Sequence, residues 1–125
     1  MTVTTERRRV DQRRGDWARV WPLARLQPER GVAALLRDGT QVAVFRTYDG
    51  DLYAVANVDP ACGAAVLSRG IVGDRAGVPT IASPMHKHVY ALPTGECLTD
   101  PRFAVARYDV RVRDGAVEVR QGGSP

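Results

Sequence analysis

The sequence contains few cysteines and no long apolar run. Its two cysteines, Cys62 and Cys97, are too few for a disulfide framework and lack Cys-x-x-Cys spacing. We therefore expect two free thiols that pack in the protein interior. No apolar segment approaches the ~20 residues that cross a bilayer, and the N-terminus lacks the apolar stretch of a signal peptide. These absences predict a cytoplasmic protein without a membrane span.

A basic domain is also absent, although the formal net charge is +4. Residues 1–16 hold five arginines against three acids, so half of this excess charge lies before residue 17. We expect residues 1–16 to be a disordered basic tail, with a phosphate-binding arm as the alternative. Because no platform of aromatic and basic residues follows the tail, nucleic acid is not expected as a partner.

From Trp17 onward, apolar residues recur with a period of two between Asp-Gly turns. Gly accepts the positive φ of a tight turn and Asp tolerates it better than most residues, so Asp-Gly between such runs is a strong hairpin signal. The pattern predicts strands at Val32–Leu36, Gln41–Thr47 and Leu52–Asn57 and a closing hairpin around Asp114-Gly115. We therefore expect one all-β domain over residues 17–120, a small sandwich or partly closed barrel, with a flexible tail at residues 121–125.

The stretch from Asn57 to Pro101 interrupts this regular spacing. Its first part, DPACGAAVLSRGIVGDRAGVPT, is rich in glycine and proline, which predicts a long loop with turns rather than a helix. Strands near Thr80–Ala82 and His88–Ala91 then flank the loop SPMHKH. Two proline-bearing loops thus end neighbouring strands, and loops that long in a compact domain are usually functional.

The two loops resemble the cluster-binding loops of Rieske domains. Their patterns are Cys-Pro-His-x-Gly-Ala and Cys-Pro-x-His, and this sequence has DPACGA from Asp59 and SPMH from Ser83, followed by VYALPTGEC. The resemblance implies a Rieske-like antiparallel β-sandwich with both loops at one tip, where such domains hold a [2Fe–2S] cluster.

The ligands of that cluster are largely missing. A Rieske centre needs two thiolates and two imidazoles. The matching positions here carry Asp59, Ala61, Ser83 and His86, so only the last agrees. Alanine has no donor atom, and carboxylate and hydroxyl oxygens are poor ligands for iron–sulfide. We predict that this chain binds no cluster.

A longer run, GAAVLSRGIVGDRAGVPTIASPMHKHVYALPTGECLTDP, resembles the small subunit of NAD(P)H-dependent nitrite reductase, a Rieske-like group whose cluster ligands are often absent. The likeness extends over most of Trp17–Arg120. It implies a non-catalytic subunit of an enzyme that reduces nitrite to ammonia in nitrate assimilation. It also implies a large subunit that uses NAD(P)H and carries FAD, sirohaem and an iron–sulfur cluster.

Two other functions stay open. Asp59, His86 and His88 could hold a mononuclear metal in an oxidoreductase component, since two histidines one residue apart in an extended segment point to the same face. The chain could also be an adaptor for another redox enzyme. Against the metal site, only two ligands are supported by spacing, so we interpret the histidines as a vestige of the ancestral pattern, reused for contact.

Contact with a partner is therefore the role expected for the tip. The candidates are Met85, Lys87 (the only lysine in the chain), His88 and Arg69. Arg69 could instead form an ion pair with Asp74 that fixes the long loop. The aromatic residues Trp17, Trp21 and Tyr90 are expected in the core.

Overall fold

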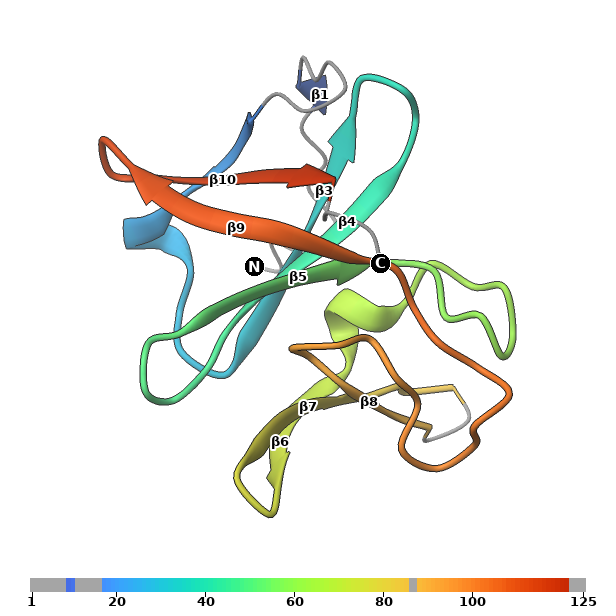
Figure 1. The fold of residues 1–125 in the computed structure, drawn as a ribbon. Helices are drawn as coiled ribbons and strands as arrows, with labels where there is room; N and C mark the ends of the chain where they lie inside the picture. The colour runs from blue at the N-terminus through green and yellow to red at the C-terminus, as the bar shows by residue number, and fades with distance from the viewer. Residues whose placement is uncertain (1–8, 11–16, 86–87, 122–125) are drawn as a thin grey trace.

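A computed structural model describes residues 9–10, 17–85 and 88–121 of the chain (Figure 1). The described residues form ten strands and two short 3₁₀ helices. They are β1 (Arg9–Val10), β2 (Ala18–Pro22), η2 (Leu23–Arg25), β3 (Arg30–Leu36), β4 (Gln41–Arg46), β5 (Leu52–Ala56), η3 (Leu67–Arg69), β6 (Ile71–Arg75), β7 (Val78–Ala82), β8 (Val89–Ala91), β9 (Arg107–Arg113) and β10 (Ala116–Gln121).

The strands form two sheets. The larger has the order β1-β3-β4-β5-β9-β10-β2, and the smaller has the order β6-β7-β8. All pairs are antiparallel except β1 with β3, which run parallel. Figure 1 shows the small sheet below the curved large one, with the short helix η3 between them. Among the described residues, no helix is long and apolar enough to cross a membrane.

The all-β prediction is confirmed, and the strands predicted at Val32–Leu36, Gln41–Thr47, Leu52–Asn57, Thr80–Ala82 and His88–Ala91 lie within two residues of their observed bounds. One predicted loop is a strand instead. Residues Ile71–Arg75 were assigned to a long loop but form β6, which pairs with β7 across a tight turn at Ala76 and Gly77. The strand was not predicted because the segment is rich in glycine and lacks apolar alternation. It lacks that alternation because β6 is an exposed edge strand.

The three Asp-Gly pairs form turns of two kinds. Asp114 (φ 52°) and Gly115 (φ 77°) are both left-handed, and Arg113 pairs directly with Ala116, so this is a two-residue hairpin loop. At the other two pairs only the glycine has a positive φ. The Asp-Gly signal therefore located all three turns, while the chain length between paired residues decided the turn type.

The interior is divided into two apolar clusters. The first lies inside the large sheet and includes Trp21, Leu36 and Val117. The second joins the two sheets and is built around Phe45, Leu67, Ile81 and Tyr90. Trp21 and Tyr90 are buried as predicted. Trp17 is not a core residue but a half-buried one that contacts two arginines.

The two cysteines are free thiols in different environments. Cys97 is buried in the second cluster, as expected. Cys62 is only partly buried because it lies in the first loop of the tip rather than on a strand. Of the predicted tails, residues 1–8, 11–16 and 122–125 lie outside the described residues, whereas Arg9–Val10 form β1 and Gln121 ends β10.

Among the glycines that the structure describes, Gly95 is the one for which a side chain costs most. Its φ is +84°, and an added Cβ would lie 2.0 Å from the carbonyl oxygen of Val105. Gly50 has a similar φ of +93° but open space around it. We predict that Gly95→Ala lowers the free energy of unfolding by about 3 kcal/mol or more, since backbone strain and a steric clash combine.

Gly50→Ala is the matched control, because it introduces the strain without the clash and should cost about 1 kcal/mol. Urea denaturation followed by circular dichroism measures both. Equal losses for the two variants would contradict the role assigned to the close approach of Gly95 and Val105.

Candidate functional site

The first loop of the tip is organised by Asp59, which is fully buried. Its backbone N–H donates to the carbonyl of Ala64 (2.8 Å), and its own carbonyl accepts from the N–H of Gly63 (2.7 Å). Gly63 has a φ of +78°, which closes this tight loop. The segment DPACGA therefore folds back on itself and directs the Asp59 carboxylate toward the second loop.

Both oxygens of the Asp59 carboxylate accept hydrogen bonds. Oδ1 accepts from the hydroxyl of Tyr90 (2.7 Å) and from the backbone N–H of Ala61 (2.9 Å). Oδ2 accepts a short hydrogen bond from the hydroxyl of Ser83. The first loop thus meets two segments that follow it by 24 and 31 residues, the end of β7 and strand β8, at one buried carboxylate.

Ser83 closes the second loop as well. Its hydroxyl oxygen accepts from the N–H of Met85 (3.3 Å), while its backbone N–H donates to the carbonyl of His88 (2.8 Å). The hydrogen bond between Ser83 and Asp59 consequently joins the two tip loops directly. We call Asp59, Ser83 and Tyr90 the carboxylate clasp.

The electrostatics of the clasp favour an ionised carboxylate. Burial by itself raises the pKa of Asp59, but hydrogen bonds from Ser83, Tyr90 and Ala61, with a contribution from Cys62, outweigh it and leave the pKa lowered. Burial also raises the pKa of Tyr90, and the neighbouring Asp59 raises it further. Tyr90 therefore stays protonated and donates to the carboxylate.

His88 lies beside the clasp and has partners of its own. Its Nδ1 is 2.9 Å from the hydroxyl oxygen of Thr99, and its ring lies against Phe103 with centroids 5.6 Å apart. The same Thr99 oxygen accepts from the N–H of Val89 (3.2 Å) and is 3.3 Å from the sulfur of Cys97. His88 is thereby held against the segment that follows β8.

The remaining predicted site residues divide into three groups. His86 and Lys87 lie outside the described residues. Ala61 contributes only its backbone N–H. Arg69 is exposed and, in the described part of the chain, makes no ion pair with Asp74, whose carboxylate instead accepts from the N–H of Gly77 (3.0 Å). The predicted Arg69–Asp74 ion pair was wrong, because the Asp74 carboxylate instead accepts a hydrogen bond inside the tight β6–β7 turn.

Sequence reasoning missed Tyr90 and Thr99 as polar members of the site. Tyr90 was expected only as a core residue, and it is one, but its hydroxyl also reaches Asp59. A buried tyrosine usually finds a hydrogen-bond partner for its hydroxyl, which was the available signal. Among the residues described, His, Cys, Asp and Glu side chains form no group of three that could hold a metal ion.

The chain resembles known proteins in both sequence and fold. Residues 16–120 match the family model of the Rieske-like [2Fe-2S] domain. The chain is 41% identical over 105 residues to the nitrite reductase (NADH) small subunit of Escherichia coli strain K12, covering 83% of this chain and 96% of that one. The chain belongs to the nitrite reductase small-subunit family.

A crystal structure and a larger protein extend this family relationship. The crystal structure, described as an NADH-dependent nitrite reductase small subunit from Mycobacterium tuberculosis, is 48% identical. It superposes with a TM-score of 0.82 and covers 87% of this chain and 97% of that one. The nitrite reductase [NAD(P)H] large subunit of Klebsiella oxytoca is 35% identical over 103 residues, which are 82% of this chain but only 11% of that protein. Small-subunit-like sequence therefore also occurs inside a large subunit.

The clasp makes a prediction about pH. Because the folded-state pKa of Asp59 is below its unfolded value of about 4, ionisation stabilises the fold fully above that pH, and this stabilisation is lost as the pH falls through the folded pKa. We predict that Asp59→Asn lowers the free energy of unfolding by about 1–3 kcal/mol at pH 7. The difference from wild type should shrink below about pH 4.

Denaturation curves recorded from pH 7 down to about pH 3 measure this difference. Asp49→Asn is the control, since Asp49 is exposed and makes no hydrogen bond in the described part of the chain. Its curve should follow that of the wild type throughout. A deficit of Asp59→Asn that stays constant across this pH range would mean that the carboxylate charge contributes nothing.

Proposed function

We propose that this chain is a cluster-free Rieske-like subunit that binds the large subunit of an NAD(P)H-dependent nitrite reductase through its two tip loops. It contributes no catalytic residue, and the large subunit supplies the chemistry that reduces nitrite to ammonia. The observation that carries this proposal is the buried hydrogen bond between Asp59 and Ser83. It joins the two loops at positions that the Rieske resemblance assigns to cysteine ligands.

The residues at the tip do not fit a [2Fe–2S] cluster. Both oxygens of Asp59 already accept hydrogen bonds, and Ser83 donates its only hydroxyl proton to one of them. Ala61, at a histidine position of the pattern, has no donor atom. An oxygen-rich site is also a poor match for an iron–sulfide core. The clasp connects the two loops by hydrogen bonds, as the metal–ligand bonds of a cluster would.

The same contacts disfavour a mononuclear metal at Asp59, His86 and His88. A metal at Asp59 would have to displace the hydrogen bonds of Ser83 or Tyr90 from a fully buried carboxylate. Nδ1 of His88 is engaged with Thr99, although Nε2 makes no such contact in the described part of the chain. No observation favours an adaptor for a different redox enzyme.

The surface around the clasp has the character of a contact surface. Pro60 and Pro84 are exposed, and three apolar side chains near them are also exposed: Val58 (41%), Met85 (54%) and Leu98 (42%). Rigid loops that present apolar side chains suit association with another protein, because little conformational freedom is lost on binding. The clasp restrains the first residue of each loop, Asp59 and Ser83, before any partner binds.

The Klebsiella protein supports association with a large subunit. In it, a segment resembling this chain is part of the same polypeptide as a large subunit. A domain that is covalently joined in one organism and separate in another is expected to bind the same partner in both. Covalent linkage replaces the affinity that a separate small subunit must obtain from its surface.

The first prediction of this proposal is that the purified chain binds no cluster. It should be colourless and contain no acid-labile sulfide, even after anaerobic incubation with iron and sulfide. Zinc or iron(II) should leave its melting temperature unchanged, because a ligand that binds only the native state raises stability by mass action. Stoichiometric iron and sulfide would refute the proposal, and a zinc shift lost in His88→Ala would establish the mononuclear site.

The second prediction concerns docking. Replacing Met85 by Ala together with Lys87 by Glu should abolish co-purification with the large subunit, because interface energy is concentrated in a few central residues. The matched control is Tyr48→Ala with Arg75→Glu, which makes similar changes at exposed positions remote from the tip loops. Both variants should keep the wild-type melting temperature. Undiminished binding by the tip variant would place the docking surface elsewhere.

A further inference from the structure

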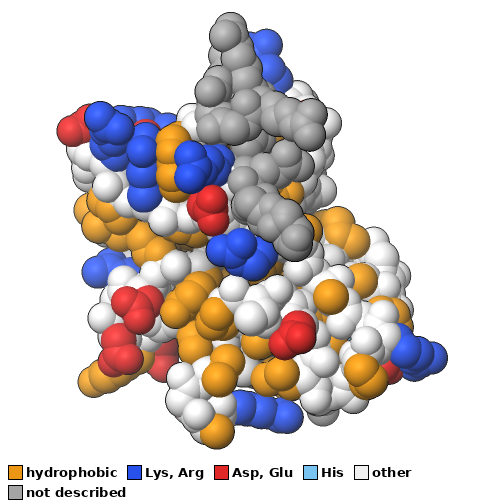
Figure 2. All heavy atoms as spheres, in the orientation of Figure 1, with side chains coloured by type: hydrophobic (Ala, Val, Ile, Leu, Met, Phe, Trp, Pro, Cys, Tyr) orange, Lys and Arg blue, Asp and Glu red, His pale blue; other side chains and the backbone are white. Residues whose placement is uncertain are grey.

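A second charged surface lies away from the tip, on the outer face of strands β2, β10 and β9. Alternation along β9 and the pairing of β10 with its neighbours place five arginines on this face, against the carboxylates of Asp109 and Glu118, while Asp114 in the adjoining turn lies 3.9 Å from Arg19. We call these arginines the arginine face: Arg19, Arg107, Arg111, Arg113 and Arg120. Figure 2 shows basic side chains gathered over the β9–β10 hairpin.

The two carboxylates hold the guanidinium groups in place. Nε of Arg111 is 2.7 Å from Glu118, whose side chain is only 10% exposed. Nε of Arg120 is 3.3 Å from Asp109. Within the described part of the chain, the terminal nitrogens of Arg111 and Arg120 make no hydrogen bond, so their donors are available to an anion.

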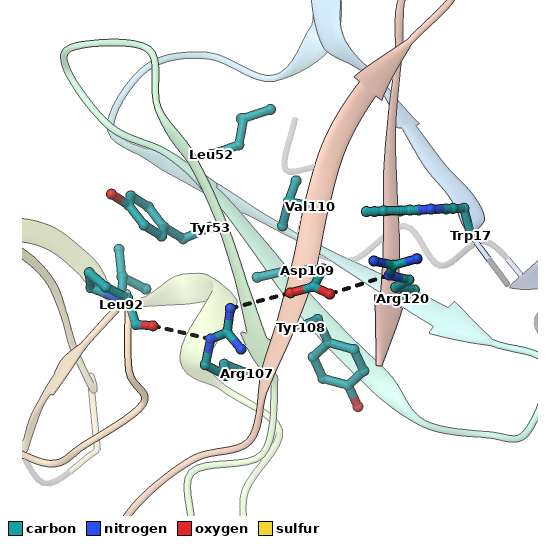
Figure 3. A pocket seen from close by; sticks show the side chains of 11 residues that line it. Trp17, Leu52, Tyr53, Leu92, Arg107, Tyr108, Asp109, Val110 and Arg120 are labelled. Carbon is teal, nitrogen blue, oxygen red and sulfur yellow. Dashed lines mark hydrogen bonds and ion pairs between the residues drawn. The ribbon is translucent and has the colours of Figure 1, made fainter. Parts of the chain in front are cut away.

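Trp17 fixes the same two side chains from another direction. The Cζ atoms of Arg111 and Arg120 lie 4.2 and 4.5 Å from the centroid of the indole ring. Figure 3 shows the ring seen edge-on beside Arg120. Stacking on an aromatic ring and a bond at Nε together restrict the guanidinium planes, so little rotamer freedom would be lost on binding a planar anion.

Next to the arginine face is a hollow of about 580 Å³. Arg107 reaches across it, donating from Nε to the carbonyl of Pro93 (3.1 Å) and from a terminal nitrogen to Asp109 (3.3 Å) (Figure 3). Its other walls include Leu52, Tyr53 and Leu92. Arginine and large aromatic residues around a partly apolar hollow are the composition of a protein interface centre.

We propose that the arginine face and this hollow form a second docking surface, which binds the carboxylate side chains of an acidic segment of the large subunit. This inference rests on the proposed function. Oriented guanidinium groups bind carboxylates in a bidentate manner, and the excess of five arginines over the three carboxylates of Asp109, Asp114 and Glu118 complements an acidic surface. Single-stranded nucleic acid fits less well, because Trp17 already stacks with arginines instead of offering a free ring to a base.

A second copy of the chain is the competing occupant, since each chain also has an acidic hollow lined by Glu29, Asp49, Asp51 and Asp74. The large subunit is favoured because the proposed contact at the tip brings it next to this chain. Measuring self-association together with affinity for the large subunit distinguishes these two occupants.

The test measures the dissociation constant of the full-length chain for the purified large subunit in low and high salt. We expect Arg107→Glu with Arg113→Glu to weaken binding about tenfold or more at ~50 mM salt, with the difference shrinking at ~500 mM as screening increases. Arg113 makes no ion pair in the described part of the chain, and the melting temperature checks folding. Arg75→Glu, an exposed arginine outside this face, should leave the affinity unchanged.

A conservative variant tests the mode of recognition. Arg120→Lys keeps the charge but loses the planar fork, so bidentate binding of a carboxylate predicts a clear loss of affinity even for this variant. Wild-type affinity in the doubly reversed variant would overturn the inference while leaving the proposed function intact. Failure of the wild-type chain itself to bind would instead contradict the proposed function.

Two further results would overturn the inference. One is wild-type self-association, measured by light scattering, that the doubly reversed variant abolishes without losing affinity for the large subunit. The other is binding of inorganic polyphosphate or a short oligonucleotide that depends on the same arginines while large-subunit affinity does not.

Discussion

The arrangement of the tip depends on one buried carboxylate. Asp59 has no exposed surface, and an ionised group in that position is stable only if its oxygens are hydrogen-bonded. Ser83, Tyr90 and Ala61 provide those bonds. Because the donors come from separate parts of the chain, satisfying one charge also fixes the two loops relative to β8.

This arrangement gives a physical account of how the two tip loops are held together. In a Rieske centre, metal–ligand bonds connect the two loops. In this chain the corresponding positions are joined by a hydrogen bond to a charged acceptor, which is among the stronger non-covalent links available to a protein.

The two surfaces proposed for contact differ in chemistry. The tip presents prolines and apolar side chains from loops held by the clasp. The arginine face presents guanidinium groups held by Asp109, Glu118 and Trp17 on rigid strands. Apolar burial contributes mainly to affinity, whereas complementary charge contributes mainly to the rate and specificity of association. A small subunit without catalytic groups would use both to hold one position on its partner.

The sequence by itself determined the all-β class, the three Asp-Gly hairpins and the family. These features are local: period-two alternation and turn chemistry act over a few residues, and the loop motifs are contiguous. It also identified Asp59 and Ser83 as the substituted positions. The sequence did not reveal β6, whose exposed edge lacks an apolar pattern. It also did not reveal that the Asp74 carboxylate accepts a hydrogen bond from Gly77 in the following turn instead of pairing with Arg69.

Only the tertiary structure decided how the substituted residues interact. Asp59 lies 24 residues from Ser83 and 31 from Tyr90, so nothing in local sequence indicates that their side chains meet. The arginine face arises in the same way, because β2 lies near the start of the chain and β9 and β10 near its end, yet sheet pairing places them side by side. Trp17 was expected in the core, but its position at this sheet edge places it against arginines. Strand pairing over long sequence separation, rather than residue type, set these contacts.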